Sequence, residues 1–432
     1  METYEEALQY IKECTKFGMK LGLERIGEIL RRLGHPEQRF RSIHIAGTNG
    51  KGSTSAMFDS ILQQAGYRTG RYNSPHLVSY RERFNVNGDM ITKAQLIRVI
   101  EQIKPVLEQV EAEGFGAPTE FEVGTAIAFQ HFANEQVDVA IVEVGMGGRF
   151  DATNVLTPVL SVITHIALDH QEYLGDTLEK IAFEKAGIIK ENIPVVVGVQ
   201  EESVREFLKN IAMERHAPCL AVDESQVQSV ALNENGTQIR LLHPAYGELK
   251  FQLALHGYHQ AHNALGVIAG CEMLNRSGLT ISCDALLAGL EAARWPSRFE
   301  RILTVEPLKL YLDGTHNPDG ARALVQTVKT LYPGEKVDLL MGMLNNRPMD
   351  EMASILSEIT RQVITTRVPD PKSASEVELG REFAKLGIPV TVEPDPAKAL
   401  SKLLETDNPL AVITGSFYLS GLLRGILLNI GD

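Results

Sequence analysis

The run HIAGTNGKGSTSAM has the composition of a phosphate-binding loop. Gly47, Gly50 and Gly52 allow backbone N–H groups to turn inward around an anion, and Lys51 adds a positive charge. The spacing differs from the common pattern G-x-x-x-x-G-K-S/T, because Ser53 comes two residues after the lysine instead of one. A glycine-rich turn without a ligand is the alternative, but the lysine and the hydroxyl groups favour bound phosphate.

The end of the apolar run VDVAIVEVG predicts a second group of functional residues. Glu143 stands at the C-terminal end of this expected strand, beside the strand that leads into the loop, which is the usual position of a magnesium ligand. The glycines of GMGGRF follow directly and predict a backbone held close to a ligand. A capping or salt-bridged glutamate is the alternative for Glu143. Asp151 is a second acid nearby, which could equally pair with Arg149.

The stretch SVITHIALDHQEYLG also ends an apolar run in polar residues, namely His165, Asp169 and His170. Three such groups just past a strand end are as typical of a functional site as of hydrogen-bonded structural residues. Imidazole is an unusual ligand for magnesium, which prefers oxygen. Residue chemistry alone therefore assigns no role to His170.

Three lysines lie in LEKIAFEKAGIIK, at positions 180, 185 and 190, and on composition they are interpreted as solvent-exposed helix lysines. Nothing in their spacing distinguishes Lys185 from the other two.

A further strand–turn–helix pattern, LYLDGTHNPDGARAL, carries Asp313, His316 and Asn317 in its turn. Ligands of open α/β sheets bind at the carboxyl ends of strands, where this turn is expected. An Asx turn with helix caps explains Asn317 well but explains Asp313 and His316 less well.

The elements that position these residues alternate between buried strands and helices, which predicts parallel sheets covered on both faces. Residues 1–40 have helical patterns, and residues 220–256 read as short β-hairpins. We place a domain boundary near Pro296 and predict an ATP-binding domain over 1–296 and a C-terminal ligase domain over 297–432. The expected fold class is α/β: a P-loop ATPase-like, parallel-sheet N-terminal domain with a small β insertion, and a smaller Rossmann-like C-terminal domain.

The composition excludes several classes of function. The formal net charge of −13 disfavours non-specific binding to nucleic acid, which depends on basic surface. The four cysteines form no C-x-x-C pair, so neither a zinc site nor a disulfide framework is expected. The acidic, helix-like start does not resemble a signal peptide, and no apolar run approaches the length of a membrane span. We therefore expect a cytoplasmic protein without nucleic-acid or membrane partners, with a monomer as the default.

Taken together, the motifs resemble the folylpolyglutamate synthase family of the Mur ligase superfamily. The resemblance rests on eight stretches in the order of the family, over roughly residues 20 to 320: GTNGKGS, NSPHLVSYRERFNVNG, VEVGMGGRFDATN, THIALDHQEYLG, FEKAGIIK, GYHQAHNA, RWPSRFE and DGTHNPDGA. It implies an ATP-dependent ligase that phosphorylates a folate carboxylate and joins it to the amine of L-glutamate. Magnesium, ATP, glutamate and a reduced folate are the implied cofactor and substrates.

The resemblance also assigns nucleotide contacts. It implies that the loop binds the ATP phosphates through Gly47, Thr48, Asn49, Gly50, Lys51, Gly52 and Ser53. Asn263 and Arg298 are similar to nucleotide contacts of the family, and Asp313 lies on the ATP and glutamate side of the expected cleft.

The same resemblance implies the metal and catalytic residues. Ser74, Glu143 and His170 are similar to magnesium ligands of the family, so His170 gains a role that its spacing did not give it. Lys185 matches a lysine that the family carbamoylates. With Lys51, Glu143, His170 and Lys185, His316 of the second domain completes the implied catalytic set.

Some family members also add glutamate to dihydropteroate. The corresponding pterin site would lie near KLGLERIGEIL and GAPTEFEVGTA, where Phe121 and Glu122 are candidate contacts. The start of a helix explains these two residues equally well, so the second activity stays open.

Two other functions compete with this hypothesis. A Mur-type ligase acting on another carboxylate is disfavoured, because only about 45 residues precede the loop and a separate N-terminal substrate domain does not fit. A nucleotide-gated binding module would not need a second catalytic domain. Its guanine-reading motif N-K-x-D is absent, and NNRP is only a superficial echo of it.

Overall fold

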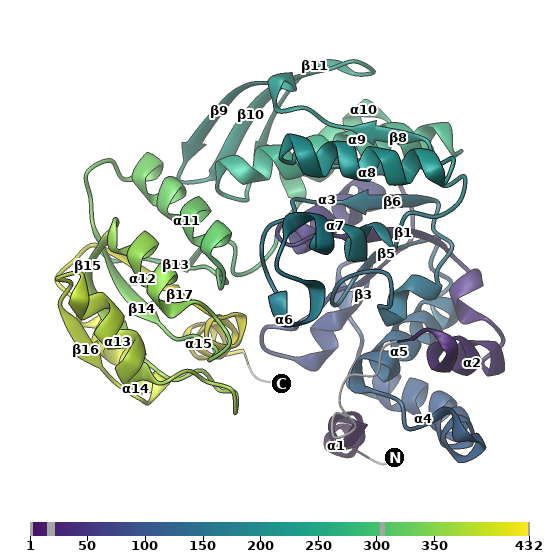
Figure 1. Cartoon of the computed structure of the whole chain (residues 1–432), viewed down its shortest axis with the longest axis horizontal. Coiled ribbons are helices and arrows are strands. Elements are labelled where there is room, and N and C mark those ends of the chain that lie inside the picture. Colours follow the sequence, from purple (N-terminus) through teal and green to yellow (C-terminus); the bar gives the residue numbers. More distant parts are fainter. Residues whose placement is uncertain (1–2, 15–21, 303–306, 431–432) are drawn as a thin grey trace.

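A computed structural model describes residues 3–14, 22–302 and 307–430 of the chain. Two α/β units lie side by side, and a small antiparallel sheet lies above them (Figure 1). The predicted fold class is therefore confirmed. In the described part of the chain, no helix is both long enough and apolar enough to cross a membrane.

The first unit is built on an eight-stranded sheet in the order β4-β3-β2-β5-β1-β6-β7-β8. All pairs from β2 to β8 are parallel, whereas β3 and β4 are added antiparallel at one edge. No strands were predicted at β2 to β4, which carry no continuous apolar run, and the hairpin region predicted from residue 220 begins inside β8, which instead belongs to the eight-stranded sheet. The strands are β1 (Arg41–Ala46), β2 (Thr69–Tyr72), β3 (Phe84–Val86), β4 (Asp89–Met90), β5 (Val139–Glu143), β6 (Leu160–Ile163), β7 (Val195–Val197) and β8 (Cys219–Ala221).

Helices cover both faces of this sheet, which explains why its strands are continuous apolar runs. Along β5, Val139 and Ile141 face one core, and Ala140 and Val142 face another. The first core contains α3 (Lys51–Gln64), α9 (Tyr258–Arg276) and α10 (Cys283–Ala292). The opposite face is covered by α1 (Tyr4–Cys14), α2 (Glu24–Arg32), α4 (Lys93–Val110) and α5 (Glu120–Asn134), and further along by α7 (Leu178–Ala186) and α8 (Glu202–Glu214).

The predicted hairpins form a three-stranded antiparallel sheet in the order β11-β10-β9. Alternate residues of β10 are buried, as expected for a sheet with one face in the core. Glu234, in the turn between β9 and β10, contacts Arg301 and Lys309 of the second unit. The strands are β9 (Val227–Asn233), β10 (Gly236–His243) and β11 (Gly247–Leu253).

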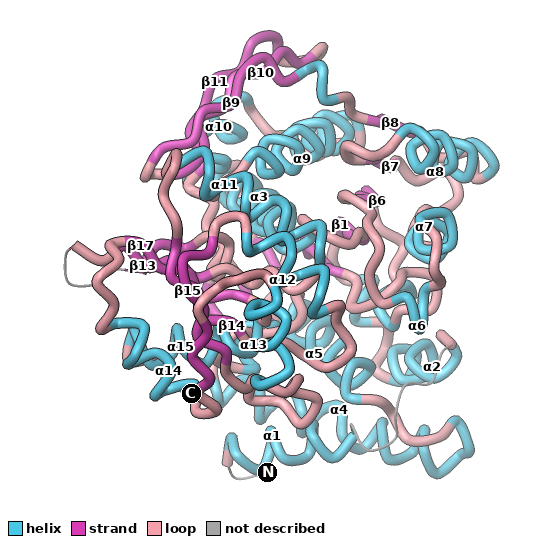
Figure 2. The backbone as a smooth tube through the Cα atoms, turned by 60° about the vertical axis from the view of Figure 1, so that its left-hand side comes forward, coloured by secondary structure: helices cyan, strands magenta, loops and turns pink. Residues whose placement is uncertain are grey.

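The second unit is a six-stranded sheet in the order β12-β13-β17-β14-β15-β16, parallel except for β12. The predicted boundary at Pro296 falls between the end of α10 and the start of β12. The strands are β12 (Glu300–Ile302), β13 (Lys309–Leu312), β14 (Val337–Met341), β15 (Thr360–Thr365), β16 (Val390–Val392) and β17 (Leu410–Thr414). One face is covered by α11 (Pro318–Leu331), α12 (Met349–Ser357) and α13 (Glu376–Lys385), and the other by α14 (Pro396–Leu404) and α15 (Phe417–Leu428) (Figure 2).

Short helical turns complete the structure and mark the loops that surround the strand ends. Of these, α6 follows β6, at the edge of the first sheet that faces the second unit (Figure 1). The turns are Pro36–Gln38, Tyr80–Arg83, Glu111–Phe115, Ala152–Val155, α6 (Gln171–Leu174) and Glu224–Gln226.

Candidate active site

The glycine-rich loop joins β1 to α3, and its glycines are required by close packing. Gly47 and Gly50 have φ angles of 152° and 90°, which L side chains rarely adopt. A Cβ atom at Gly47 would lie 1.8 Å from Oγ1 of Thr164, and one at Gly50 would lie 2.3 Å from Oδ1 of Asn263. Gly50 is also the N-cap of α3. The first N–H groups of that helix, which have no partner within the helix, therefore lie at the end of the loop. This geometry is suited to binding an anion.

Two lysines converge on this loop. Nζ of Lys51 donates to the backbone oxygens of Gly47 and Thr48, at 3.1 Å each. Nζ of Lys185 donates to the same Gly47 oxygen at 2.8 Å. The interpretation of Lys185 as a solvent-exposed lysine was wrong, because the residue is only 5% exposed. Burial, together with the charge of Lys51, lowers the pKa of Lys185 to about 7.

Glu143 lies where the strand pattern placed it. It is the last residue of β5 and pairs in register with Ile45 of β1, two residues before the loop begins. Its Oε1 lies 3.9 Å from Nζ of Lys51, and its Oε2 accepts a 2.6 Å hydrogen bond from the amide of Asn73. Burial raises the pKa of Glu143, although Lys51 and the Asn73 amide favour its charged form.

Asn73 was not selected from the sequence, yet it holds the carboxylate of Glu143 and directly precedes Ser74. Replacing Asn73 with alanine is expected to raise the magnesium concentration for half-maximal activity by about 10- to 100-fold, because Glu143 is the candidate magnesium ligand and the partners of metal ligands orient them. A magnesium titration of turnover measures this effect. Asn134→Ala, at an exposed amide on α5, is the control. An unchanged magnesium requirement in Asn73→Ala would rule out this role.

The loop after Glu143 differs from the prediction. Arg149 pairs with Glu184 and not with Asp151, so that alternative was wrong. The carboxylate of Asp151 instead accepts hydrogen bonds from Thr153 and from the backbone N–H of Met146. The glycines allow close packing within the protein: a Cβ atom at Gly148 would lie 2.8 Å from the Glu184 backbone oxygen, and one at Gly145 would lie 2.5 Å from the ring of Phe121.

Asp169 joins the two units. Its carboxylate forms an ion pair with Arg347, which follows β14 in the second unit, and accepts from the Asn317 amide at 3.3 Å. Nε2 of His316 lies 3.7 Å from the same carboxylate. Burial alone would raise the pKa of Asp169, but His316, His170 and Arg347 together lower it well below its usual range.

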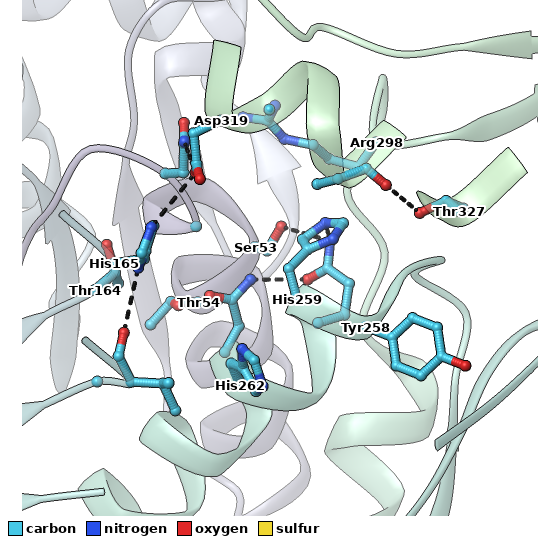
Figure 3. A pocket seen from close by; sticks show the side chains of 18 of the residues that line it. Ser53, Thr54, Thr164, His165, Tyr258, His259, His262, Arg298, Asp319 and Thr327 are labelled. Carbon is cyan, nitrogen blue, oxygen red and sulfur yellow. Dashed lines mark hydrogen bonds and ion pairs between the residues drawn. The ribbon is translucent and has the colours of Figure 1, made fainter. Parts of the chain in front are cut away.

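Two further contacts cross the same cleft. The Asn49 amide of the loop donates to Asp319 at 2.6 Å, and Nε2 of His165 lies 3.5 Å from the same aspartate (Figure 3). Burial alone would lower the pKa of His165, but the neighbouring Asp319 raises this pKa above its ordinary value. The first turn of α11 therefore lies against the glycine-rich loop, together with Asn317 of the predicted turn, whose amide donates to Asn49.

Arg298 and Asp313 lie on the second unit's side of this cleft. Asp313 accepts from the backbone N–H groups of Phe299 and Thr315, at 2.9 Å each, so its carboxylate also organises the turn. The guanidinium carbon of Arg298 lies 4.5 Å from the ring centroid of Phe417.

A cavity of about 640 Å³ lies between the loop, the β insertion and the second unit. Figure 3 shows Ser53 and Thr54 on α3, His259 and His262 on α9, and Arg298 around it. Its size is typical of a small-molecule site. Predicted residues in its lining are Asn49, Gly50, Ser53, Asn263, Arg298, Asp313 and His316.

The predicted pterin contacts are only partly available to a ligand. Glu122 is 4% exposed, and its carboxylate pairs with Arg25 and accepts from Thr119, which caps α5. The helix-start explanation therefore accounts for Glu122. Phe121 packs against Gly145 and stays a candidate. Lys20 and Leu21 of the predicted N-terminal part of this site lie outside the described residues.

The residues present fit a magnesium ion in part. Across residues 3–14, 22–302 and 307–430, no group of three or more His, Cys, Asp or Glu side chains is arranged to hold a metal. Magnesium usually keeps several waters and needs only one or two carboxylates in addition to substrate phosphates. Glu143 supplies one such carboxylate, and the Ser74 hydroxyl is the further oxygen ligand that the sequence predicts, whereas the imidazole of His170 departs from the ion's preference for oxygen.

Comparison with known proteins defines the class. Residues 45–271 match the Mur ligase middle domain, and residues 297–417 match the Mur ligase glutamate ligase domain. The fold and cleft are thus those of a Mur ligase. A dihydrofolate synthase/folylpolyglutamate synthase of Bacillus subtilis is 36% identical over 421 residues, covering 96% of this chain and 97% of the relative.

Solved structures agree with this result. The Mycobacterium tuberculosis folylpolyglutamate synthase complexed with ADP has a TM-score of 0.90 and 32% identity, covering 98% of this chain and 99% of that one. An Escherichia coli relative in complex with DHPP and ADP has a TM-score of 0.86 and 29% identity, covering 99% and 98%. The chain belongs to the family of folylpolyglutamate and dihydrofolate synthases within the Mur ligases.

Proposed function

We propose that the chain is an ATP-dependent ligase that adds L-glutamate to the glutamate carboxylate of a folate, releasing ADP and phosphate. The single observation that carries this proposal is one interdomain cleft, where Asp169 pairs with Arg347 and His316 and the glycine-rich loop contacts the second unit through Asn49. The family of the chain supports the reaction, because its relatives are named for glutamate addition to folates.

The chemistry explains why ATP is needed. A carboxylate is a poor electrophile because its leaving group would be oxide. Transfer of the γ-phosphoryl group to the carboxylate gives an acyl phosphate, and the glutamate amine then displaces phosphate to form the amide. The γ-phosphate of ATP and the folate carboxylate are both anions, so transfer of the phosphoryl group between them requires positive charge and fixed orientation.

The residues of the first unit supply those requirements. The backbone N–H groups of the loop bind the phosphates, and Lys51 places a positive charge beside the negatively charged phosphoryl group during its transfer. Glu143 and Ser74 would hold magnesium, with His170 as a further candidate. When bound, the ion neutralises phosphate charge. Asn263 and Arg298 contact the nucleotide, and Asp313 orders the turn beside it.

The second unit contributes residues that approach the same point from the other side. Arg347 was not predicted as a site residue. It lies in the loop between β14 and α12, and ligands of open α/β sheets bind near the carboxyl ends of strands. Its planar guanidinium suits a carboxylate, and its side chain is only 11% exposed. We assign Arg347 and His316 to the glutamate side of the cleft.

The reaction is tested by measuring ADP release with ATP and glutamate in the presence of either tetrahydrofolate or dihydropteroate. Release with tetrahydrofolate is expected, with a product heavier by one glutamyl residue. Release with dihydropteroate would add dihydrofolate synthase activity, for which Phe121 is the candidate contact. Release with neither compound would refute the proposal.

The same assay separates the two alternative functions. A Mur-type ligase acting on another carboxylate would release ADP only with that other substrate. A nucleotide-gated module would hydrolyse ATP without any acceptor. We assign the enzyme to the cytoplasm as a monomer, with small molecules and not nucleic acid or membrane as partners.

A further inference from the structure

Trp295, the only tryptophan in the sequence, packs directly on the phosphate loop. It lies in the linker between α10 and β12. A Cβ atom at Gly52 would lie 2.6 Å from the indole Nε1 and 2.8 Å from Cε2. Any side chain at position 52 would therefore displace the indole. The first turn of α3 and the linker to the second unit are thus in immediate contact.

Arg71 holds this indole from the first unit. Its guanidinium carbon lies 4.7 Å from the centroid of the Trp295 ring, within the range of a cation–π contact. Its Nε lies 3.0 Å from Oδ2 of Asp59 on α3, and the side chain is only 12% exposed. Within the described part of the chain, Nη1 of Arg71 has no hydrogen-bond partner. The reaction proposed above gives Arg71 no role.

Asp59 is itself fixed, so Arg71 has little freedom. The other oxygen of Asp59 accepts from the hydroxyl of Thr69 at 2.5 Å and from the amide of Gln63 at 2.8 Å. Arg71 thus joins β2, α3 and the linker through one buried guanidinium. A cation–π contact is stronger when the pair is removed from water, and here the Arg71 side chain is only 12% exposed while Trp295 is partly buried.

The linker beyond Trp295 has an unusual backbone. Ser297 and Phe299 have φ angles of 60° and 49°, a left-handed conformation that is rare for a bulky residue. The backbone oxygen of Ser297 accepts from the N–H of Gly314 at 2.8 Å, and the Phe299 ring stacks on Tyr311 at 4.1 Å. Such conformations persist only where the surroundings determine them.

Arg298 lies between Ser297 and Phe299, so the conformation of the linker determines the position of its guanidinium. Its side chain reaches the nucleotide cavity (Figure 3). If Trp295 moved, the backbone of Ser297 and Arg298 would move with it, because only two residues separate Trp295 from the arginine that lines the cavity. The position of Arg298 therefore depends on what holds Trp295.

We propose that Arg71 is a positioning residue for nucleotide binding, which holds the Trp295 indole on Gly52 and so fixes the linker that places Arg298 in the cavity. The proposal rests on ATP being the nucleotide substrate, as proposed above. It predicts that the loss of Arg71 weakens ATP binding without weakening glutamate binding.

The first test compares Arg71→Leu with Arg71→Lys. Arg71→Leu is expected to raise the KM for ATP by about tenfold, or about 1.4 kcal/mol, and to leave the KM for glutamate unchanged. Arg71→Lys retains a cation and is expected to recover most of the loss. Arg240→Leu, at an exposed arginine of the β insertion, is the control. An unchanged KM for ATP, or an equal rise for every substrate with a lower Tm, would overturn the proposal.

The second test uses Trp295 as a single fluorescent reporter and does not depend on a variant that folds. In the unaltered protein, a non-hydrolysable ATP analogue is expected to change the Trp295 emission in parallel with binding measured by calorimetry. Binding without any change in emission would overturn the coupling. Absence of binding in calorimetry would instead defeat the proposed function.

Discussion

Replacing Lys51 with alanine is expected to reduce turnover by at least about 100-fold, comparable to the loss of one preorganised charge-stabilising group. The variant removes the positive charge nearest to Glu143, whose Oε1 lies 3.9 Å from Nζ. Steady-state ADP release with ATP, glutamate and folate measures this effect.

The fold is expected to survive this substitution. Lys51 is part of the first turn of α3, and its Nζ donates to two backbone oxygens of the loop and lies 3.9 Å from Glu143, so its loss removes no apolar packing. Lys180→Ala is the control, because the Lys180 side chain is 62% exposed and forms its ion pair with the exposed Asp176. If Lys51→Ala retains turnover while melting normally, then the loop does not act on the transferred phosphate.

Lys185→Ala should also lose most activity, by about 100-fold, and should recover part of it when short carboxylates are added. The neutral amine of Lys185 can add carbon dioxide and release a proton, giving a carbamate anion. Because burial lowers the pKa of Lys185 to about 7, a substantial neutral fraction exists at that pH. The anion would support a metal in a site that has few carboxylates.

Chemical rescue and protein mass together test the carbamate. A small carboxylate such as formate or acetate can enter the space left by the side chain and supply the missing anion. Native mass measurement in bicarbonate buffer should show carbon dioxide bound to the unaltered protein but not to Lys185→Ala. Full activity in Lys185→Ala, or loss that no carboxylate repairs, would contradict a carbamate at this position.

The sequence predicted those parts of the site that depend on contiguous residues. The loop was recognisable because the glycines, lysine and hydroxyls stand together between a strand and a helix. Glu143 was recognisable because a buried parallel strand is a continuous apolar run that ends where its ligands begin. Both depend on backbone geometry that a few neighbouring residues determine.

The remaining parts depend on contacts between distant segments. Arg347 and Asp169 are 178 residues apart and meet only when the two units pack together. Glu122 and Arg25 are 97 residues apart, although Thr119 three residues before Glu122 already indicated a helix cap. The first pair follows from the packing of the two units and the second from the packing of α2 against α5 within the first unit, so neither can be read from local patterns.

Lys185 is a different case, because a local signal existed. Ile181 and Ala182 of α7 are buried, and Lys185 follows them by four and three residues, which places it on the same helix face. Helical periodicity would therefore have predicted a buried lysine. Composition alone suggested the opposite, since lysines are rarely buried.

In the proposed reaction, the γ-phosphoryl group moves from ATP onto the folate carboxylate before the amide forms. The most direct measurement uses folate whose terminal carboxylate carries a heavy oxygen isotope, followed by mass analysis of the released phosphate. Transfer of one labelled oxygen to phosphate is predicted, because the oxygen that bridges carbon and phosphorus leaves with the phosphoryl group. Unlabelled phosphate, with glutamylated product formed, would contradict the acyl phosphate and the account built on it.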